Sequence, residues 1–95
     1  MRKYEVMYII RPDLNEETTK ELVAKFPNLI TNNGGDVVKV EEMGKRRLAY
    51  EINDYTEGYY VLVYFQSETS VIAELERVLR ITDGVIRYLI VKDEK

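Results

Sequence analysis

The sequence predicts a single α+β domain over residues 1–95, with its elements in the order β-α-β-β-α-β. Three observations support this prediction. Side chains alternate between two faces in the segments expected to form strands, apolar residues recur at helical spacing in two others, and glycine or polar turn residues separate them. A chain of 95 residues also has room for only one hydrophobic core.

The first strand is expected over Lys3 to Ile10, where aromatic and β-branched residues alternate with a period of two. A helix follows, with Asn15 as its N-cap and Gly34-Gly35 as its C-terminal stop. Pro27 falls inside this helix and has no amide proton for the carbonyl of Val23. We therefore expect the helix to bend at Pro27.

The second and third strands are predicted on either side of a polar turn. The second covers Asp36 to Asn53, with a bulge or sharp bend at Gly44. The turn covers Asn53 to Gly58, and the third strand covers Tyr59 to Gln66.

The second helix is predicted from about Glu68 to Thr82, with Ser67 as its N-cap and Asp83-Gly84 as its stop. The last strand covers Val85 to Lys92. Two amphipathic helices can cover one face of a four-stranded antiparallel sheet, which gives the ferredoxin-like arrangement. The opposite face of the sheet is then open.

The composition excludes several classes of chemistry, because the chain contains no His, no Cys and no Trp. Ser-His and Cys-His nucleophile pairs, ordinary zinc or iron–sulfur sites and disulfides are all excluded. No pair of carboxylates converges as general acid and base, and no phosphate-binding glycine loop is present. We therefore predict a protein that is not an enzyme, with no catalytic residues, no metal, no cofactor and no small-molecule substrate.

No stretch of the sequence reaches the length of about 18 apolar residues that a membrane-spanning helix needs. The apolar run of Val6 to Ile10 is also too short for the core of a signal peptide. The sequence therefore predicts a cytoplasmic protein that does not interact with a membrane.

The open face is predicted to carry too many large apolar side chains for a surface that faces water. These residues are Met7, Ile9, Tyr60, Leu62, Tyr64, Leu89 and Val91. Contiguous exposed apolar surface is typical of a contact with another molecule, so this face is a candidate protein interface. The alternatives are that these strands are buried from both sides and need no partner, or that residues such as tyrosine simply suit strands.

Seven basic residues form the second candidate site. They are Arg2, Lys3, Lys45, Arg46, Arg47, Arg87 and Lys92. Arginine and lysine on extended backbone suit the phosphates of a nucleic acid, although such a run also protects a sheet edge from aggregation. The net charge of −3 argues against RNA binding through bulk charge and leaves a local basic patch possible.

One segment resembles the signature of the bacterial ribosomal small-subunit protein six family: Gly44-Lys45-Arg46-Arg47-Leu48-Ala49-Tyr50-Glu51-Ile52. The opening Met1 to Pro12 and the closing Leu89 to Lys92 are also similar to that family. The resemblance implies a ferredoxin-like protein of the small ribosomal subunit. It further implies binding to the central domain of 16S rRNA together with ribosomal protein eighteen.

Combined with the two surfaces, the resemblance predicts that the apolar face receives ribosomal protein eighteen and that the basic residues face rRNA phosphates. The alternative is a small ligand-binding or regulatory domain of the same topology that associates with itself through the open face. The oligomeric state distinguishes the two, because a stable homodimer favours the alternative.

Overall fold

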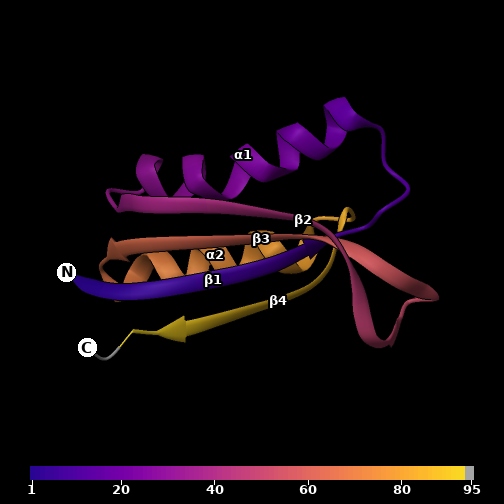
Figure 1. Ribbon diagram of the computed structural model, residues 1–95. Helices are drawn as coiled ribbons and strands as arrows, with labels where there is room; N and C mark the ends of the chain where they lie inside the picture. Colours follow the sequence, from indigo (N-terminus) through magenta and orange to yellow (C-terminus); the bar gives the residue numbers. More distant parts are fainter. Residues whose placement is uncertain (94–95) are drawn as a thin grey trace.

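The computed structural model describes residues 1–93, and Figure 1 shows their arrangement. The elements are β1 (Arg2–Ile10), α1 (Glu16–Asn32), β2 (Asp36–Ile52), β3 (Tyr55–Ser67), α2 (Thr69–Ile81) and β4 (Val85–Lys92). The predicted element order is therefore confirmed. No helix within the described residues is long and apolar enough to cross a membrane.

The strands form one sheet of four strands in the order β2-β3-β1-β4, and every neighbouring pair is antiparallel. β1 and β3 are the inner strands, while β2 and β4 are the two edges. Side chains from both helices join one hydrophobic cluster on a single face of the sheet. The predicted four-stranded ferredoxin-like fold with an open sheet face is confirmed.

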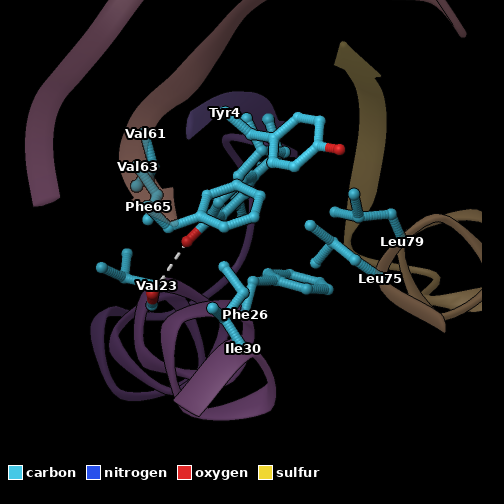
Figure 2. Packing of buried hydrophobic residues seen from close by; sticks show 12 residues of the cluster. Tyr4, Val23, Phe26, Ile30, Val61, Val63, Phe65, Leu75 and Leu79 are labelled. Atoms are coloured by element: carbon cyan, nitrogen blue, oxygen red, sulfur yellow. Dashed lines mark hydrogen bonds between the residues drawn. The ribbon is translucent and has the colours of Figure 1, made fainter. Parts of the chain in front are cut away.

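The core lies between the two helices and the sheet face that they cover. Tyr8 of β1 packs edge-on against Phe26 of α1, with ring centroids 4.7 Å apart. Tyr4 stacks on Phe65 of β3 at 5.6 Å. Figure 2 shows part of this cluster from close by, with Tyr4, Phe26 and Phe65 labelled. Aliphatic side chains complete the packing: Val6, Ile10, Val23, Ile30, Val61, Val63, Leu75 and Leu79. Alternate residues of β1 and β3 thus face the helices, as their period of two predicts.

The helix α1 continues through Pro27, and a side chain donates to the carbonyl that the proline leaves without an amide partner. Proline cannot donate to the carbonyl four residues earlier, which is that of Val23. The buried hydroxyl of Tyr8 donates to this same carbonyl oxygen at 2.8 Å, as the dashed line in Figure 2 marks. Burial raises the pKa of Tyr8, with a smaller contribution from the charge of Glu42, so Tyr8 stays protonated and able to donate. The predicted bend at Pro27 stays a prediction.

The N-cap prediction is confirmed for α1 and wrong for α2. The Asn15 side chain accepts from the amide of Thr18 at 2.8 Å, which satisfies one of the free amides of the first turn. Ser67 is instead the last residue of β3, paired with Arg2, and its hydroxyl donates to the carbonyl of Glu68. Glu68 occupies the N-cap position without a side-chain hydrogen bond. The ladder with β1 thus extends one residue further than the sequence indicates.

The turn predicted over Asn53 to Gly58 is also wrong. β2 and β3 are joined by Asn53 and Asp54 alone, with φ angles of 50° and 70°. Asparagine and aspartate tolerate this left-handed region, which two-residue hairpin turns of the favoured twist require. Strand β3 consequently begins at Tyr55 instead of Tyr59. The predicted bulge at Gly44 is confirmed by a register shift between Glu42 and Gly44 and by a φ of 78°.

The hairpin of β2 and β3 extends beyond the end of β1, because the last β1–β3 pair joins Ile10 to Tyr59. We call residues 45–58 the distal arm. It begins after the Gly44 bulge and holds the basic run Lys45 to Arg47. Figure 1 shows this part of the hairpin bending away from α1, toward the side of the sheet where β4 lies.

Candidate interaction surfaces

The open face of the sheet is organised in three rows that run across β3, β1 and β4. Register places Leu62, Met7 and Leu89 side by side in the middle row. The row on the distal-arm side is Tyr60, Ile9 and Arg87, and the row on the other side is Tyr64, Glu5 and Val91. All seven predicted apolar residues therefore lie on the face opposite the helices.

Six of the seven are accessible to a partner. Leu89 and Val91 are 54% and 40% exposed, and the side chains on β1 and β3 are half-buried among their neighbours: Met7, Tyr60, Leu62 and Tyr64. Neither helix covers them. Across the hairpin, β2 offers the ion pair of Lys39 and Glu41 to the same face, with 2.8 Å between the amine and the carboxylate. The apolar surface therefore covers β3, β1 and β4 and ends at β2.

Ile9 departs from the prediction, because it is only 2% exposed. It lies outside the helix-side cluster, so the helices are not what buries it. A Cβ placed on Gly58 would overlap the Cγ2 of Ile9, which shows how closely the distal arm approaches this side chain. Ile9 thus packs against the distal arm and is not accessible to a partner on the open face.

The seven predicted basic residues are all exposed, and none forms an ion pair with a carboxylate within residues 1–93. Five other basic residues are paired in this way: Arg11, Lys20, Lys39, Arg77 and Arg80. Charges that carboxylates already neutralise have less attraction left for a phosphate. The charges of the seven predicted residues are therefore available to bind phosphate. Among the described residues, Lys25 is the only other lysine or arginine without an ion pair.

These basic residues do not form one patch. Arg2, Lys3 and Lys92 lie at the end of the sheet where β1 begins, because Arg2 and Lys3 open β1 and Lys92 pairs with Tyr4. The remaining four lie at the opposite end, on or beside the distal arm: Lys45, Arg46, Arg47 and Arg87. At about 3.4 Å per strand residue, roughly 20 Å separates the two groups. A single nucleic acid would have to span the sheet to touch both.

A charged cluster anchors the loop between β1 and α1 beside the distal arm. The Arg11 guanidinium makes a bidentate contact with Asp13, at 2.8 and 2.9 Å, and reaches Asp83 at 3.2 Å. The Tyr55 hydroxyl of the arm donates to the same Asp13 carboxylate at 3.4 Å. The hydrogen bond from Arg11 lowers the pKa of Asp13, with a smaller contribution from Tyr55. The cluster thus joins the ends of β1, β3 and α2.

This cluster gives a pH prediction. Because the pKa of Asp13 is lowered in the folded protein, the Arg11–Asp13 pair stabilises the fold fully above about pH 4, and this contribution is lost as the pH falls through the lowered pKa. Carboxyl NMR titration should place the Asp13 inflection below its ordinary value of 3.8. In Arg11→Gln the inflection should return toward that value. An inflection at or above 3.8 in the unmodified protein would contradict the assignment.

Comparison with known proteins identifies the family. The family model described as ribosomal protein S6 matches residues 3–92 of the chain. The chain belongs to the ribosomal protein S6 family. Curated relatives named small ribosomal subunit protein bS6 include those of Halalkalibacterium halodurans, 56% identical over all of both chains, and Exiguobacterium sibiricum, 55% identical over the same extent.

The fold agrees with a solved member of the ribosomal protein S6 family. The crystal structure of 30S ribosomal protein S6 from Thermotoga maritima superposes with a TM-score of 0.93 at 38% identity. The match covers 97% of this chain and 87% of that one. The resemblance to the protein six family is confirmed over nearly the whole chain.

Membership in the ribosomal protein S6 family confirms three further predictions. The chain is a structural ribosomal protein of the small subunit, it is not an enzyme, and its location is cytoplasmic, with the ribosome.

One pocket of about 340 Å³ lies between β2 and the start of α1. Lys45 lines this pocket, together with Glu16 and Lys20, which form an ion pair with each other. No group of three metal-ligating side chains occurs in the described residues.

Sequence reasoning missed the residues that hold the distal arm, Tyr50 and Tyr55. The Arg87 guanidinium donates to the Tyr50 hydroxyl and lies 5.7 Å from its ring centroid, while Arg11 lies 5.8 Å from the ring of Tyr55. These partners are 37 and 44 residues apart in the sequence, counting 87 − 50 and 55 − 11. No periodicity links positions so distant. The only signal in the sequence is Tyr50, which lies three residues after the basic run Lys45 to Arg47.

Proposed function

We propose that this chain binds the central domain of 16S rRNA together with ribosomal protein eighteen, with the open sheet face receiving the protein and the basic residues contacting RNA phosphates. The observation that carries the proposal is that the seven predicted basic residues make no ion pair with a carboxylate in the described chain. Unpaired, exposed guanidinium and ammonium groups are the chemistry that phosphate binding uses.

The net charge explains why a partner is needed. Counterion release depends on the phosphates neutralised locally, whereas the long-range field of a chain with net charge −3 repels RNA. A partner that covers the open face adds its own RNA contacts and holds both proteins on one RNA surface. The binding energy is therefore shared, and the chain alone binds weakly.

The apolar face fits a protein better than it fits RNA. Leu62, Met7 and Leu89 form a continuous aliphatic row with no basic residue in it. Nucleic-acid interfaces are polar and positively charged, whereas the centre of a protein interface is depleted of charge and rich in aromatic residues and methionine. The tyrosines at positions 60 and 64 flank the aliphatic row on β3.

The experiment is a titration of a 16S central-domain fragment with this chain, with ribosomal protein eighteen, and with both together. We expect the pair to bind at least tenfold more tightly than either protein alone. Equal affinity with and without the partner would disprove the cooperative scheme. A stable homodimer of this chain in solution would instead favour the self-associating alternative.

Two matched variants locate the partner site. Leu89→Glu places a charge in the aliphatic row and should remove the gain that ribosomal protein eighteen provides. Ile81→Glu introduces the same charge at the end of α2, where the side chain is 66% exposed and away from the open face. This control should retain the gain. If both variants retain it, the open face is not the partner site.

A further inference from the structure

The distal arm reaches a strand that is not its neighbour. β2 and β4 are the two edges of the sheet, separated by β3 and β1, or roughly 14 Å at the usual strand spacing. Even so, Tyr50 near the end of β2 contacts Arg87 of β4 through both its hydroxyl and its ring. The arm must therefore pass across the end of β1, in agreement with the bend in Figure 1.

The other strand of the arm is held at a second point. Tyr55 of β3 donates from its hydroxyl to Asp13, and the Arg11 guanidinium lies over its ring. Arg11 is itself fixed by Asp13 and Asp83 and by its own amide, which donates to the carbonyl of Gly84 at 2.9 Å. Each strand of the arm thus contributes one tyrosine that engages one arginine of the sheet or its loops.

Close packing at the base of the arm adds a third contact. Gly58 lies against Ile9, where the absence of a Cβ allows the arm to approach the sheet. Leu48 is the only buried residue of β2, and it follows the basic run directly. Lys45, Arg46 and Arg47 therefore lie on backbone that is anchored on both sides, while their own side chains remain exposed.

We propose that Tyr50 and Tyr55 are positioning residues that hold the distal arm in one orientation, so that Lys45, Arg46 and Arg47 meet the rRNA backbone already ordered. This inference rests on the proposed function. A two-stranded hairpin that extends beyond its sheet is marginally stable by itself, so an unbraced arm would have to be ordered on binding. The two tyrosine–arginine contacts order the arm when the protein folds, so that less conformational entropy is lost when RNA binds.

We call the contacts of Tyr50 with Arg87 and of Tyr55 with Arg11 the brace of the distal arm. Amide hydrogen exchange tests this brace without any RNA. Tyr50 is 60% exposed, so Tyr50→Leu should leave the core folded. We expect exchange across residues 45–58 to accelerate by about tenfold in Tyr50→Leu, with β1 and the part of β3 beyond Tyr59 unchanged. Tyr50→Phe keeps the ring beneath Arg87 and should retain most of the protection. Unchanged exchange in Tyr50→Leu would overturn the brace.

Salt-dependent RNA binding tests the positioning role, using the complex of this chain with ribosomal protein eighteen and the 16S central-domain fragment. Tyr50→Leu should weaken binding by about five- to tenfold at every salt concentration, with the slope of log K against log salt unchanged. An unchanged slope means that the same number of phosphates is contacted, while more conformational entropy is lost in ordering the arm. Tyr50→Phe should restore most of the affinity.

The outcomes separate the two proposals. A lower slope in Tyr50→Leu would mean that a phosphate contact was lost, which overturns a purely positioning role. Equal affinity of Tyr50→Leu and the unmodified chain would overturn the inference while leaving the proposed function in place. Failure of the unmodified pair to bind the fragment would overturn both the proposed function and the role of the arm in RNA binding, and the exchange data would then decide the brace alone.

Discussion

Charge reversal of the distal arm, Lys45→Glu with Arg47→Glu, is expected to weaken rRNA binding by the complex with ribosomal protein eighteen by about 10- to 100-fold near 0.1 M salt. Each lost phosphate contact should also reduce the slope of log K against log salt by about one unit, so the double variant should lose about two. Both residues are exposed and unpaired with carboxylates, so their reversal breaks no ion pair within residues 1–93.

The matched control is Arg77→Glu with Arg80→Glu on α2, which changes the net charge by the same amount. These two arginines are already paired, with Glu74 at 2.6 Å and Glu76 at 2.7 Å. Their reversal should lower affinity only through the general field and leave the slope close to that of the unmodified chain. Equal losses of slope in the two double variants would show that no phosphate contact is specific to the arm.

The sequence predicted what depends on local pattern. Asn15 caps α1 because its side chain needs only the amide three residues later, and that geometry is set within one helical turn. The alternation of β1 correctly assigned Tyr8 to the helix side and Met7 to the open side. Gly44 was recognised as a bulge because a glycine within an alternating strand suits few other structures.

The failed predictions depend on contacts that local pattern does not contain. Ser67 has the chemistry of an N-cap, yet pairing with Arg2 retains it in β3. The polar segment after Asn53 has the composition of a turn, but pairing across the hairpin extends the strand to Tyr55. Ile9 is buried where Gly58 of the distal arm packs closely against it, and local sequence does not show this contact because the two residues are far apart in the chain.

Loss of the Tyr8 hydroxyl is expected to cost about 1–3 kcal/mol of folding stability in Tyr8→Phe. The substitution preserves the ring that packs against Phe26 and removes only the donor to the Val23 carbonyl. Because Pro27 cannot supply an amide in its place, that buried oxygen would be left without a partner. Urea unfolding measures the loss of folding stability. Tyr4→Phe is the control and should be close to neutral, because the Tyr4 hydroxyl makes no hydrogen bond within residues 1–93.

A double-mutant cycle with Pro27→Ala isolates the cause. An alanine at position 27 restores an amide four residues after Val23, so the carbonyl no longer depends on Tyr8. Tyr8→Phe should then cost less by about 1 kcal/mol in the Pro27→Ala background than in the unmodified chain. Additive losses would mean that the hydroxyl and the missing amide are unconnected. A positive coupling would establish that Tyr8 of β1 replaces the hydrogen bond that Pro27 cannot make. The strand that carries the open face would then also stabilise α1.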